Sequence, residues 1–364
     1  MSARALVLEA PRSLRGHDFA IPEIGKDDAV LRVEACGLCG TDHEQFSGQL
    51  HPGFAFIPGH EAVGIIEKIG PVAEQRWGVQ AGSRVAVEVF QSCRSCDQCL
   101  AGCYRRCSRH GLGDMYGFVA VDVPPGLWGG YATHQYLAPD SMLLPVPDEL
   151  PPTVATLFNP VGAGIRWGAT VPQTRSGDLV AVLGCGVRGL SAAAAAKEAG
   201  ADFVMITGAG DRDRPRLAAA AAFGADLVVD VTSDDPVKRF RDATGASGAD
   251  VVVDVTAKAP EAFAQAVHLA AVGARIVVAG TRGGGGAPGF EPDHIVYKEL
   301  RVEGALGVDV VAYQQALDLL ASGTYPFADL DRQLVGLRDV EALLTVMAGG
   351  PGTPPIHGVV VPDQ

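Results

Sequence analysis

The sequence lacks the features that would place the chain in a membrane or on a nucleic acid. It has no run of about 18 uncharged apolar residues, which excludes a membrane-spanning helix. Basic residues number 29 against 42 acidic ones, and a net charge of −13 repels phosphate backbones, so we expect no nucleic-acid partner. The first residues, Met1–Ala10, lack the apolar block of a secretion signal. We therefore expect a cytoplasmic protein.

The composition is that of an ordinary globular protein. Hydrophobic residues make up 48% of the chain and charged residues 20%, which excludes an intrinsically disordered protein. A length of 364 residues predicts two domains. No internal repeat is evident, so the two domains are expected to differ.

Two patterns of hydrophobicity divide the chain near Pro160. Short β-type runs separated by glycine and proline fill the first 150 residues, which indicates an all-β unit with irregular loops. The clearest of these runs are Ala29–Glu34, Glu61–Ile69 and Ser83–Val89. After Gly307 a helix is expected over Val310–Ala321, followed by a loop-rich tail.

Between the two, apolar strands alternate with alanine-rich helices. The expected strands are Leu179–Leu183, Phe203–Thr207, Leu227–Val229, Val251–Val255 and Arg275–Ala279. The expected helices are Gly189–Ala199, Arg214–Phe223 and Pro260–Leu269. This alternation predicts a parallel, doubly wound sheet of the α/β class.

A glycine-rich turn, Gly-Cys-Gly-Val-Arg-Gly, links the first of these strands to its helix. Gly184 permits the tight turn, Gly186 lets the backbone approach a pyrophosphate, and Gly189 lets helix and strand pack closely. The start of the helix, with Val187 and Arg188, offers unpaired N–H groups to phosphate oxygens. We predict a dinucleotide site at this turn.

The residues after the second strand bear on the choice between NAD and NADP, because an acid there binds the ribose 2′-hydroxyl of NAD. The first acid is Asp211, which we assign to the ribose. Arg212, Arg214 and Arg216 could instead meet the 2′-phosphate of NADP, although Asp211 and Asp213 would repel it. NAD is therefore favoured, and a solvated helix start remains the alternative explanation of the arginines.

Five of the eight cysteines lie between positions 93 and 107. Cys93, Cys96, Cys99 and Cys107 have a spacing that suits four thiolates around one structural zinc ion. Zinc there would fix a lobe, residues 90–110, that has little apolar core of its own. Cys103 is expected to be a bystander.

Two further motifs complete a recognisable set. They are Cys36-Gly-Leu-Cys39-Gly-Thr-Asp-His43 and Pro58-Gly-His-Glu-Ala-Val-Gly64. With the cysteine cluster, the glycine turn and Gly129-Gly-Tyr-Ala132, they occur in the order of the zinc-dependent medium-chain alcohol dehydrogenases. The chain resembles that family over nearly its whole length.

The resemblance implies a GroES-like catalytic domain, residues 1–159 and 308–364, and a Rossmann coenzyme domain, residues 160–307. It implies two zinc ions per chain, one catalytic and one structural, and a homodimer or homotetramer. Coenzyme domains of the family often pair through an edge strand, for which Leu300–Leu306 is the candidate here. The implied reaction is hydride transfer between an alcohol and a nicotinamide cofactor.

Carried onto this chain, the family pattern makes Cys39 and His60 ligands of the catalytic zinc. Glu61 is a neighbouring acid that can approach the metal, and Asp42 would orient His60 through its other ring nitrogen. Thr41 would hydrogen-bond the alcohol and pass its proton outward. Cys36 is expected to lie in the core.

The sequence departs from the family at two places. A third zinc ligand is usually Cys, Asp or Glu, but the position falls on Asn159, which is either a weak neutral ligand or part of an Asn-Pro turn. The His that often ends the proton relay is replaced by Glu44, with His43 one residue earlier. Either side chain could exchange the proton with water, and His43 titrates near neutral pH.

The substrate class is only weakly indicated. Aromatic residues in two loops would favour a secondary or bulky apolar alcohol if they line the site: Phe46, Phe54, Phe56, Tyr116, Phe118 and Trp128. Two other functions compete with the zinc enzyme. One is a zinc-free quinone or enoyl reductase, and the other is a non-catalytic dinucleotide sensor that keeps only the structural zinc.

Overall fold

The computed structural model describes residues 2–364, and Met1 lies outside the described residues. The chain separates into two compact units. The first contains the residues up to Asn159 together with Asp309–Gln364, and the second is Pro160–Val308. Among residues 2–364, no helix combines the length and the apolar character needed to cross a membrane.

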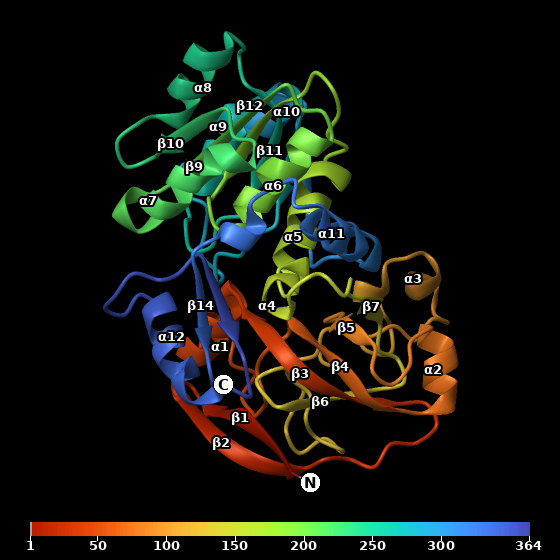
Figure 1. Ribbon diagram of the computed structural model, residues 1–364. Coiled ribbons are helices and arrows are strands. Elements are labelled where there is room, and N and C mark those ends of the chain that lie inside the picture. Colours follow the sequence, from red (N-terminus) through yellow and green to blue (C-terminus); the bar gives the residue numbers. More distant parts are fainter. Residues whose placement is uncertain (1) are drawn as a thin grey trace. The chain divides into compact units, whose positions relative to one another are not determined.

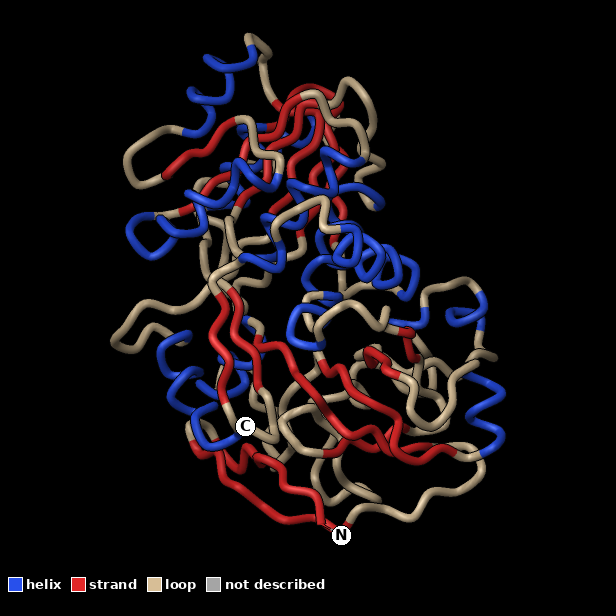
Figure 2. Tube along the Cα trace, in the orientation of Figure 1, coloured by secondary structure: helices blue, strands red, loops and turns tan. Residues whose placement is uncertain are grey.

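The first unit is built mainly on β-structure. β1 (Ser2–Ala10) and β2 (Ser13–Ala20) form an antiparallel hairpin, visible near the N-terminus in Figure 2. A second sheet has seven strands in the order β14-β15-β3-β4-β5-β7, with β6 beside β3. These strands are β3 (Ala29–Leu38), β4 (Ala62–Ile69), β5 (Arg84–Val87), β6 (His134–Leu137), β7 (Leu143–Pro145), β14 (Arg332–Val335) and β15 (His357–Val360).

Helices interrupt this unit, so the expectation of an all-β unit was wrong in detail. They are α1 (Gly40–Ser47), α2 (Pro71–Trp77), α3 (Asp97–Leu100), α4 (Pro152–Ala155), α11 (Val310–Ser322) and α12 (Val340–Met347). Short 3-10 turns lie at Tyr104–Arg106, Phe327–Asp329 and Leu337–Asp339. Helices of two turns, such as α1 and α2, have too few apolar positions to show a 3.6-residue period.

The C-terminal tail is ordered secondary structure, which corrects the expectation of a loop-rich tail. β15 pairs in parallel with β14 and antiparallel with β3, where Gly358 lies opposite Leu38. Strands of four residues are too short for a clear alternation to be recognised. The tail therefore completes the sheet that contains β3, the strand that directly precedes Cys39.

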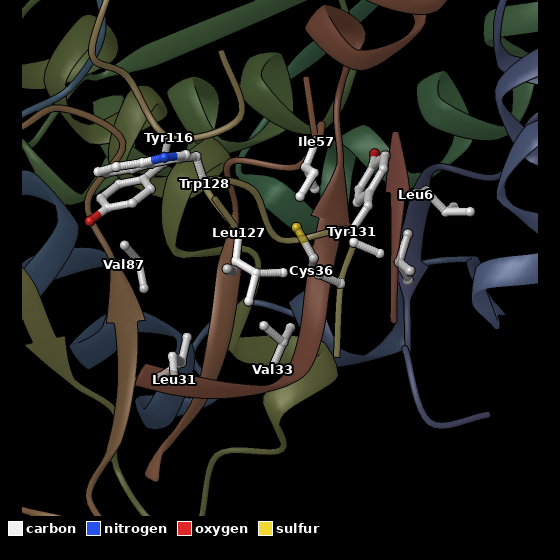
Figure 3. Packing of buried hydrophobic residues seen from close by; sticks show 14 of the residues in the cluster. Leu6, Leu31, Val33, Cys36, Ile57, Val87, Tyr116, Leu127, Trp128 and Tyr131 are labelled. Carbon is white, nitrogen blue, oxygen red and sulfur yellow. The ribbon is translucent and has the colours of Figure 1, made fainter. Parts of the chain in front are cut away.

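The core of the first unit lies against β3 and its neighbours. Figure 3 shows Cys36, on β3, among Ile57, Leu127 and Tyr131. The Cys36 side chain has no exposed surface, as expected for a core residue. Burial raises the pKa of its thiol well above the usual value, so the group stays neutral.

The second unit is a doubly wound sheet, which confirms the predicted fold class. Six parallel strands are hydrogen-bonded in the order β10-β9-β8-β11-β12-β13. They are β8 (Leu179–Leu183), β9 (Phe203–Gly208), β10 (Leu227–Asp230), β11 (Ala249–Asp254), β12 (Ala270–Val278) and β13 (Arg301–Gly304). Numbered along the unit this is 3-2-1-4-5-6, the order of the Rossmann fold. β13 is the edge strand within the Leu300–Leu306 candidate.

Helices accompany these strands along the chain (Figure 1). They are α5 (Phe158–Ile165), α6 (Val187–Glu198), α7 (Gly210–Ala219), α8 (Pro236–Thr244), α9 (Ala262–Leu269) and α10 (Asp293–Tyr297), with a π-helical turn at Arg166–Thr170 and a 3-10 turn at Ala220–Phe223. α7 begins four residues before its expected start, because Gly210 and the polar residues after it already form its first turn.

Candidate active site

The first part of the site is the start of helix α1. Cys39 is the N-cap residue of this helix, and its Sγ accepts a hydrogen bond from the backbone N–H of Thr41 at 3.3 Å. Asp42 completes a capping box, since its Oδ2 accepts from the Cys39 backbone N–H at 2.8 Å. The thiol of Cys39 is therefore held at a helix N-terminus, where a thiolate is favoured.

His60 approaches from the segment before β4. Its Nε2 lies 3.1 Å from the Sγ of Cys39, and its Nδ1 lies 3.6 Å from the Oδ1 of Asp42. His60 and Asp42 are buried. Neither His60 Nδ1 nor Asp42 Oδ1 has a hydrogen-bond partner in the part of the chain that the structure describes. The Asp42 carboxylate thus faces Nδ1 of His60, whereas the other ring nitrogen, Nε2, faces Cys39.

These residues fit a metal ion. The ligand atoms of Cys39, Asp42 and His60 all lie within 4.8 Å of one another. A thiolate and an imidazole are the ligands that zinc prefers, and a carboxylate on the far ring nitrogen is the usual partner of a zinc-binding histidine. The Sγ of Cys39 and the Nε2 of His60 face each other at 3.1 Å, so an ion bound beside them could be held by both atoms.

Glu61 and Asn159 do not join this cluster in the same way. The buried carboxyl group of Glu61 packs over Gly37, where a Cβ would collide with it. Asn159 is buried, and its Nδ2 donates to the hydroxyl oxygen of Tyr313 at 2.8 Å. It lies inside helix α5, not in a turn, because α5 begins at Phe158.

The three relay candidates, Thr41, His43 and Glu44, lie on α1 together with Asp42, the acid expected to orient His60. Asp42 is buried, and the other three are half-buried. One short helix therefore carries the groups that the family pattern assigns to proton transfer.

The four cysteines of the lobe form a compact cluster. The sulfur atoms of Cys93, Cys96, Cys99 and Cys107 lie within 4.8 Å of one another. Cys93 Sγ and Cys99 Sγ are 3.8 Å apart. Sulfur atoms at about 2.3 Å from a tetrahedral zinc ion are about 3.8 Å apart, so the spacing fits this ion. All eight cysteines of the chain are free thiols.

Local hydrogen bonds prepare two of these thiols for metal binding. Bonds from the Ser95 hydroxyl and from backbone N–H groups lower the pKa of Cys93 to about 5. Backbone hydrogen bonds likewise lower the pKa of Cys96 to about 7. Burial raises the pKa of Cys99, in contrast, to about 11. Thiolates are the form that binds zinc, so near neutral pH Cys93 and Cys96 are the two thiols prepared for it.

The three glycines of the dinucleotide turn differ in what a side chain would meet. Gly184 has a φ of +103°, which L-residues rarely adopt. A Cβ on Gly189 would collide with the carbonyl oxygen of Gly184, whereas a Cβ on Gly186 would meet no atom within 4 Å. Space is thus open at the one glycine where a pyrophosphate would approach. Val187 and Arg188 begin α6, and the Arg188 guanidinium lies 5.7 Å from the ring centre of Trp167.

After β9, the carboxylates of Asp211 and Asp213 point in different directions. Asp211 lies in the first turn of α7, is mostly exposed, and is ion-paired with Arg214. Asp213 instead turns back, and its Oδ2 accepts from the backbone N–H of Ala209 at 2.9 Å. Burial raises the pKa of the Cys185 thiol, inside the glycine turn, to about 12, and the nearby charge of Asp213 adds to this increase.

The sequence did not predict an ion pair that lies beside the glycine turn. Asp254 ends β11 and is ion-paired with Arg282, which follows β12. The Thr256 hydroxyl also donates to Asp254, at 2.6 Å, and the Thr256 methyl would contact a Cβ on Gly184. These residues lie at or after the carboxyl ends of β8, β11 and β12. The strand order reverses between β8 and β11, and sheets of this kind bind dinucleotides at that point. The one sign of this ion pair in the sequence is Asp254 itself, an acid at the end of an apolar strand.

The aromatic residues are mostly structural. Phe46, Phe56, Tyr116 and Trp128 belong to the buried core of the first unit, so they are not substrate-facing candidates. Phe54 is exposed. Phe118 differs, because its ring centre lies 5.9 Å from that of His60. It is the aromatic residue of the six that stands beside a candidate ligand.

Comparisons with known proteins agree with this geometry. Residues 25–148 match the model of the alcohol dehydrogenase GroES-like domain, and residues 188–322 match that of the zinc-binding dehydrogenases. A Mycobacterium tuberculosis protein named "Probable alcohol dehydrogenase adh" is 68% identical over 361 residues, covering 99% of this chain and 98% of its own. The chain belongs to the zinc-dependent medium-chain alcohol dehydrogenases.

Solved structures resemble the chain over its whole length. Alcohol dehydrogenase TADH from Thermus sp. ATN1 is 25% identical, with a TM-score of 0.83 over 98% of this chain and 99% of its own. A Sinorhizobium meliloti 1021 protein solved with NADP bound is 26% identical, with a TM-score of 0.82 over 100% of both chains. The family is one of oxidoreductases that interconvert alcohols and carbonyl compounds with a nicotinamide cofactor.

Proposed function

We propose that the protein is an alcohol dehydrogenase whose catalytic zinc is held by Cys39 and His60. The observation that carries this proposal is the Cys39 Sγ to His60 Nε2 distance of 3.1 Å, with Asp42 behind the imidazole ring. When bound, zinc supplies a Lewis acid that lowers the pKa of an alcohol. The chain's own residues hold the ion, orient the imidazole and move the proton.

Each residue near the metal has a distinct proposed task. Asp42 fixes both ligand residues: it accepts a hydrogen bond from the backbone N–H of Cys39, and it faces the imidazole ring of His60. Thr41 receives the proton of the alcohol, and His43 or Glu44, half-buried on the same helix, passes it to water. Glu61 stays over Gly37 as a second carboxylate that can approach the metal.

Two zinc ions per chain are part of the proposal. The sulfur spacing of Cys93, Cys96, Cys99 and Cys107 supports the structural ion. Asn159, in the third-ligand position, would complete the catalytic site through its carbonyl oxygen. A protein with many free cysteines suits a reducing compartment, which supports a cytoplasmic location.

For the cofactor we propose NAD over NADP, with Asp213 as the residue that binds the adenosine ribose. Its carboxylate lies at the end of β9 beside the glycine turn, whereas Asp211 faces solvent with Arg214. A carboxylate at this place accepts hydrogen bonds from ribose hydroxyls and repels a 2′-phosphate. Arg216 pairs with Asp213 at 3.1 Å, so this arginine supports the acid.

For the substrate we propose a secondary or bulky apolar alcohol. The supporting observation is the position of Phe118 against His60. An aromatic ring next to a metal ligand offers contact to an apolar substituent and no hydrogen bond to a polyol.

For the assembly we propose a homodimer, or a homotetramer built from it, with β13 at the contact. β13 is the outer strand of its sheet, and its side chains are exposed. Exposed apolar side chains surround it, on β12, α10 and β13 itself: Val272, Val296, Tyr297 and Val302. An edge strand with unpaired backbone groups is a template for pairing with a second chain, and exposed apolar side chains favour such a contact.

The test of the function is reduction of NAD or NADP across linear, cyclic, aromatic and polyol alcohols, before and after metal removal. We expect turnover of apolar secondary alcohols with NAD that disappears on removal and returns with zinc. Cys39→Ala should lose activity and keep one zinc ion per chain. An active Cys39→Ala enzyme would falsify the proposed catalytic site.

A further inference from the structure

The amide of Asn159 is held by one particular side chain. Its Nδ2 donates to the hydroxyl oxygen of Tyr313 at 2.8 Å. Both residues are almost fully buried, with 4% and 1% of their surface exposed. A hydrogen bond in such surroundings fixes the rotation of the amide, because water offers no competing partner.

Tyr313 is itself held from several sides. Its ring packs edge-on against Phe158, the residue before Asn159, with ring centres 5.0 Å apart. Tyr313 lies on α11, whose first turn is capped by Asp309 through the backbone N–H of Ala312 at 3.0 Å. Arg105 lies 3.7 Å from the Asp309 carboxylate. The hydroxyl therefore occupies a defined position relative to the start of α5.

The segment that ends in Asn159 also reaches the strand that carries Cys39. Thr156, three residues before Asn159, lies with its hydroxyl 3.4 Å from Nε2 of His357. His357 begins β15, and the next residue, Gly358, lies opposite Leu38 on β3. Leu38 directly precedes Cys39. A short series of contacts thus ties the third-ligand position to the first ligand.

We propose that Tyr313 is a positioning residue for the catalytic metal site, directing the carbonyl oxygen of Asn159 to the ion. This proposal rests on the proposed function of Cys39 and His60. The carbonyl oxygen is the one metal-ligating atom of a neutral amide, so the side of the amide that Tyr313 holds decides where that oxygen points. A charged ligand would be drawn to the metal by its own charge, whereas a neutral amide depends on such an orienting bond.

The experiment uses the zinc-loaded enzyme and three readouts: zinc retained against increasing chelator, the absorption spectrum after cobalt(II) replacement, and turnover. The variants are Tyr313→Phe, Asn159→Ala and the double mutant. Tyr136→Phe is the matched control, because Tyr136 donates to Asp28 at 2.9 Å and packs edge-on against Trp128 at 5.0 Å. Like Tyr313 it makes one hydroxyl hydrogen bond and one edge-on ring contact, away from the proposed ligands, although its hydroxyl donates where that of Tyr313 accepts.

We expect Tyr313→Phe to bind the catalytic zinc ion about tenfold more weakly. Loss of a residue that orients a metal ligand typically has an effect of this size. The cobalt spectrum changes as well, and the second, tetracysteine ion stays in place. The double mutant should lose no more affinity than Asn159→Ala alone, since Tyr313 acts through Asn159. Tyr136→Phe should match the wild type in all three readouts.

Two results would overturn the proposal in different ways. If the wild type holds two zinc ions and Tyr313→Phe keeps wild-type affinity and spectrum, Tyr313 has no positioning role, and the proposed function stands. If the wild type holds only the tetracysteine ion and turns over no alcohol, the proposed function fails, and this proposal fails with it.

Discussion

Asp42 Oδ2 accepts a hydrogen bond from the backbone N–H of Cys39 at 2.8 Å, while its other oxygen lies 3.6 Å from the His60 ring. One buried carboxylate therefore positions both proposed ligands. Asp42→Asn keeps the shape of the side chain and removes its charge. We expect the catalytic zinc to be held about 10 to 100-fold more weakly, the range measured for partners of metal ligands. Metal retention against a chelator measures the effect.

The control for this variant is Asp18→Asn, which alters an exposed carboxylate 3.9 Å from Arg4. It should hold zinc as the wild type does. Equal retention by Asp42→Asn and the wild type would show that the carboxylate only caps helix α1.

Gly186→Ala tests the dinucleotide turn without disturbing the fold. A Cβ at Gly186 meets no atom within 4 Å, so the variant should be as stable as the wild type. A bound pyrophosphate would meet that methyl group, and we expect at least about tenfold weaker NAD binding, equivalent to about 1.4 kcal/mol. Titration calorimetry with NAD, together with a thermal unfolding curve, separates the two effects.

Gly16→Ala is the matched control, because a Cβ there also lies in open space, on β2. It should bind NAD normally. If Gly186→Ala also binds NAD normally, the cofactor does not approach this turn.

Asp213→Asn and Asp211→Asn distinguish the two candidate ribose acids. Loss of the Asp213 charge removes an acceptor for the ribose hydroxyls and a repulsion toward a 2′-phosphate. We expect the preference for NAD over NADP in kcat/KM to fall about tenfold in Asp213→Asn, or by about 1.4 kcal/mol. Asp211→Asn should change it less than about twofold. The opposite result would return the role to the acid that the sequence indicated.

The buried carboxyl group of Glu88 should make the folding stability of the protein depend on pH. Its carboxyl is fully buried, it accepts hydrogen bonds from Tyr104 at 2.7 Å and from the Phe90 N–H at 3.1 Å, and burial raises its pKa to about 8. Between the ordinary pKa of 4.5 and about 8, the folded state keeps a proton that the unfolded state has released. The contribution of this group to the free energy of unfolding is therefore fully present below pH 4.5, and it is lost as the pH rises to about 8.

Glu88→Gln removes this dependence, since a neutral amide replaces the titrating group. Relative to the wild type, the variant should gain stability as the pH rises from 5.5 to 8, by at most about 1.4 kcal/mol per pH unit. Urea unfolding of both proteins at several pH values measures the difference. A difference that stays constant over this range would show that Glu88 does not titrate there.

Val302→Lys tests the proposed contact at β13. Val302 is 40% exposed on an edge strand, and a lysine there would bring like charges together across a two-fold contact. We expect the assembly to fall to a smaller species in size-exclusion chromatography with light scattering. The control is Leu334→Lys, on the edge strand β14 of the other sheet, with Leu334 43% exposed. An unchanged assembly in Val302→Lys would place the contact elsewhere.

The sequence was sufficient to predict the doubly wound sheet and the motifs because these features are local. A strand, a glycine turn and a helix follow one another within about 20 residues, and each has its own signal. The tail was not predictable, since β14 and β15 are four residues each and gain their hydrogen bonds from one another and from β3. Their pairing is non-local, and no local period reveals it.

The site residues also divide into those with a local sequence signal and those without one. Cys39 and His60 stand in motifs, whereas the proposal of Asp213 as the ribose acid depends on geometry. The first turn of α7 brings the carboxylate of Asp213 back to Ala209 and leaves that of Asp211 exposed to solvent, and this difference is the basis of the proposal. Tyr313 is 154 residues from Asn159 and has no motif of its own.

The ion pair between Arg105 and Asp309 joins the cysteine-rich lobe to the start of α11, across 204 positions of sequence. Arg105 lies between two cysteines of the lobe, and the Asp309 carboxylate also caps the helix. A change of either residue alone removes an ionic partner from the other, which is largely buried. Relatives of this protein should therefore exchange the two positions together. A chimera that receives a foreign lobe will need a matching helix start.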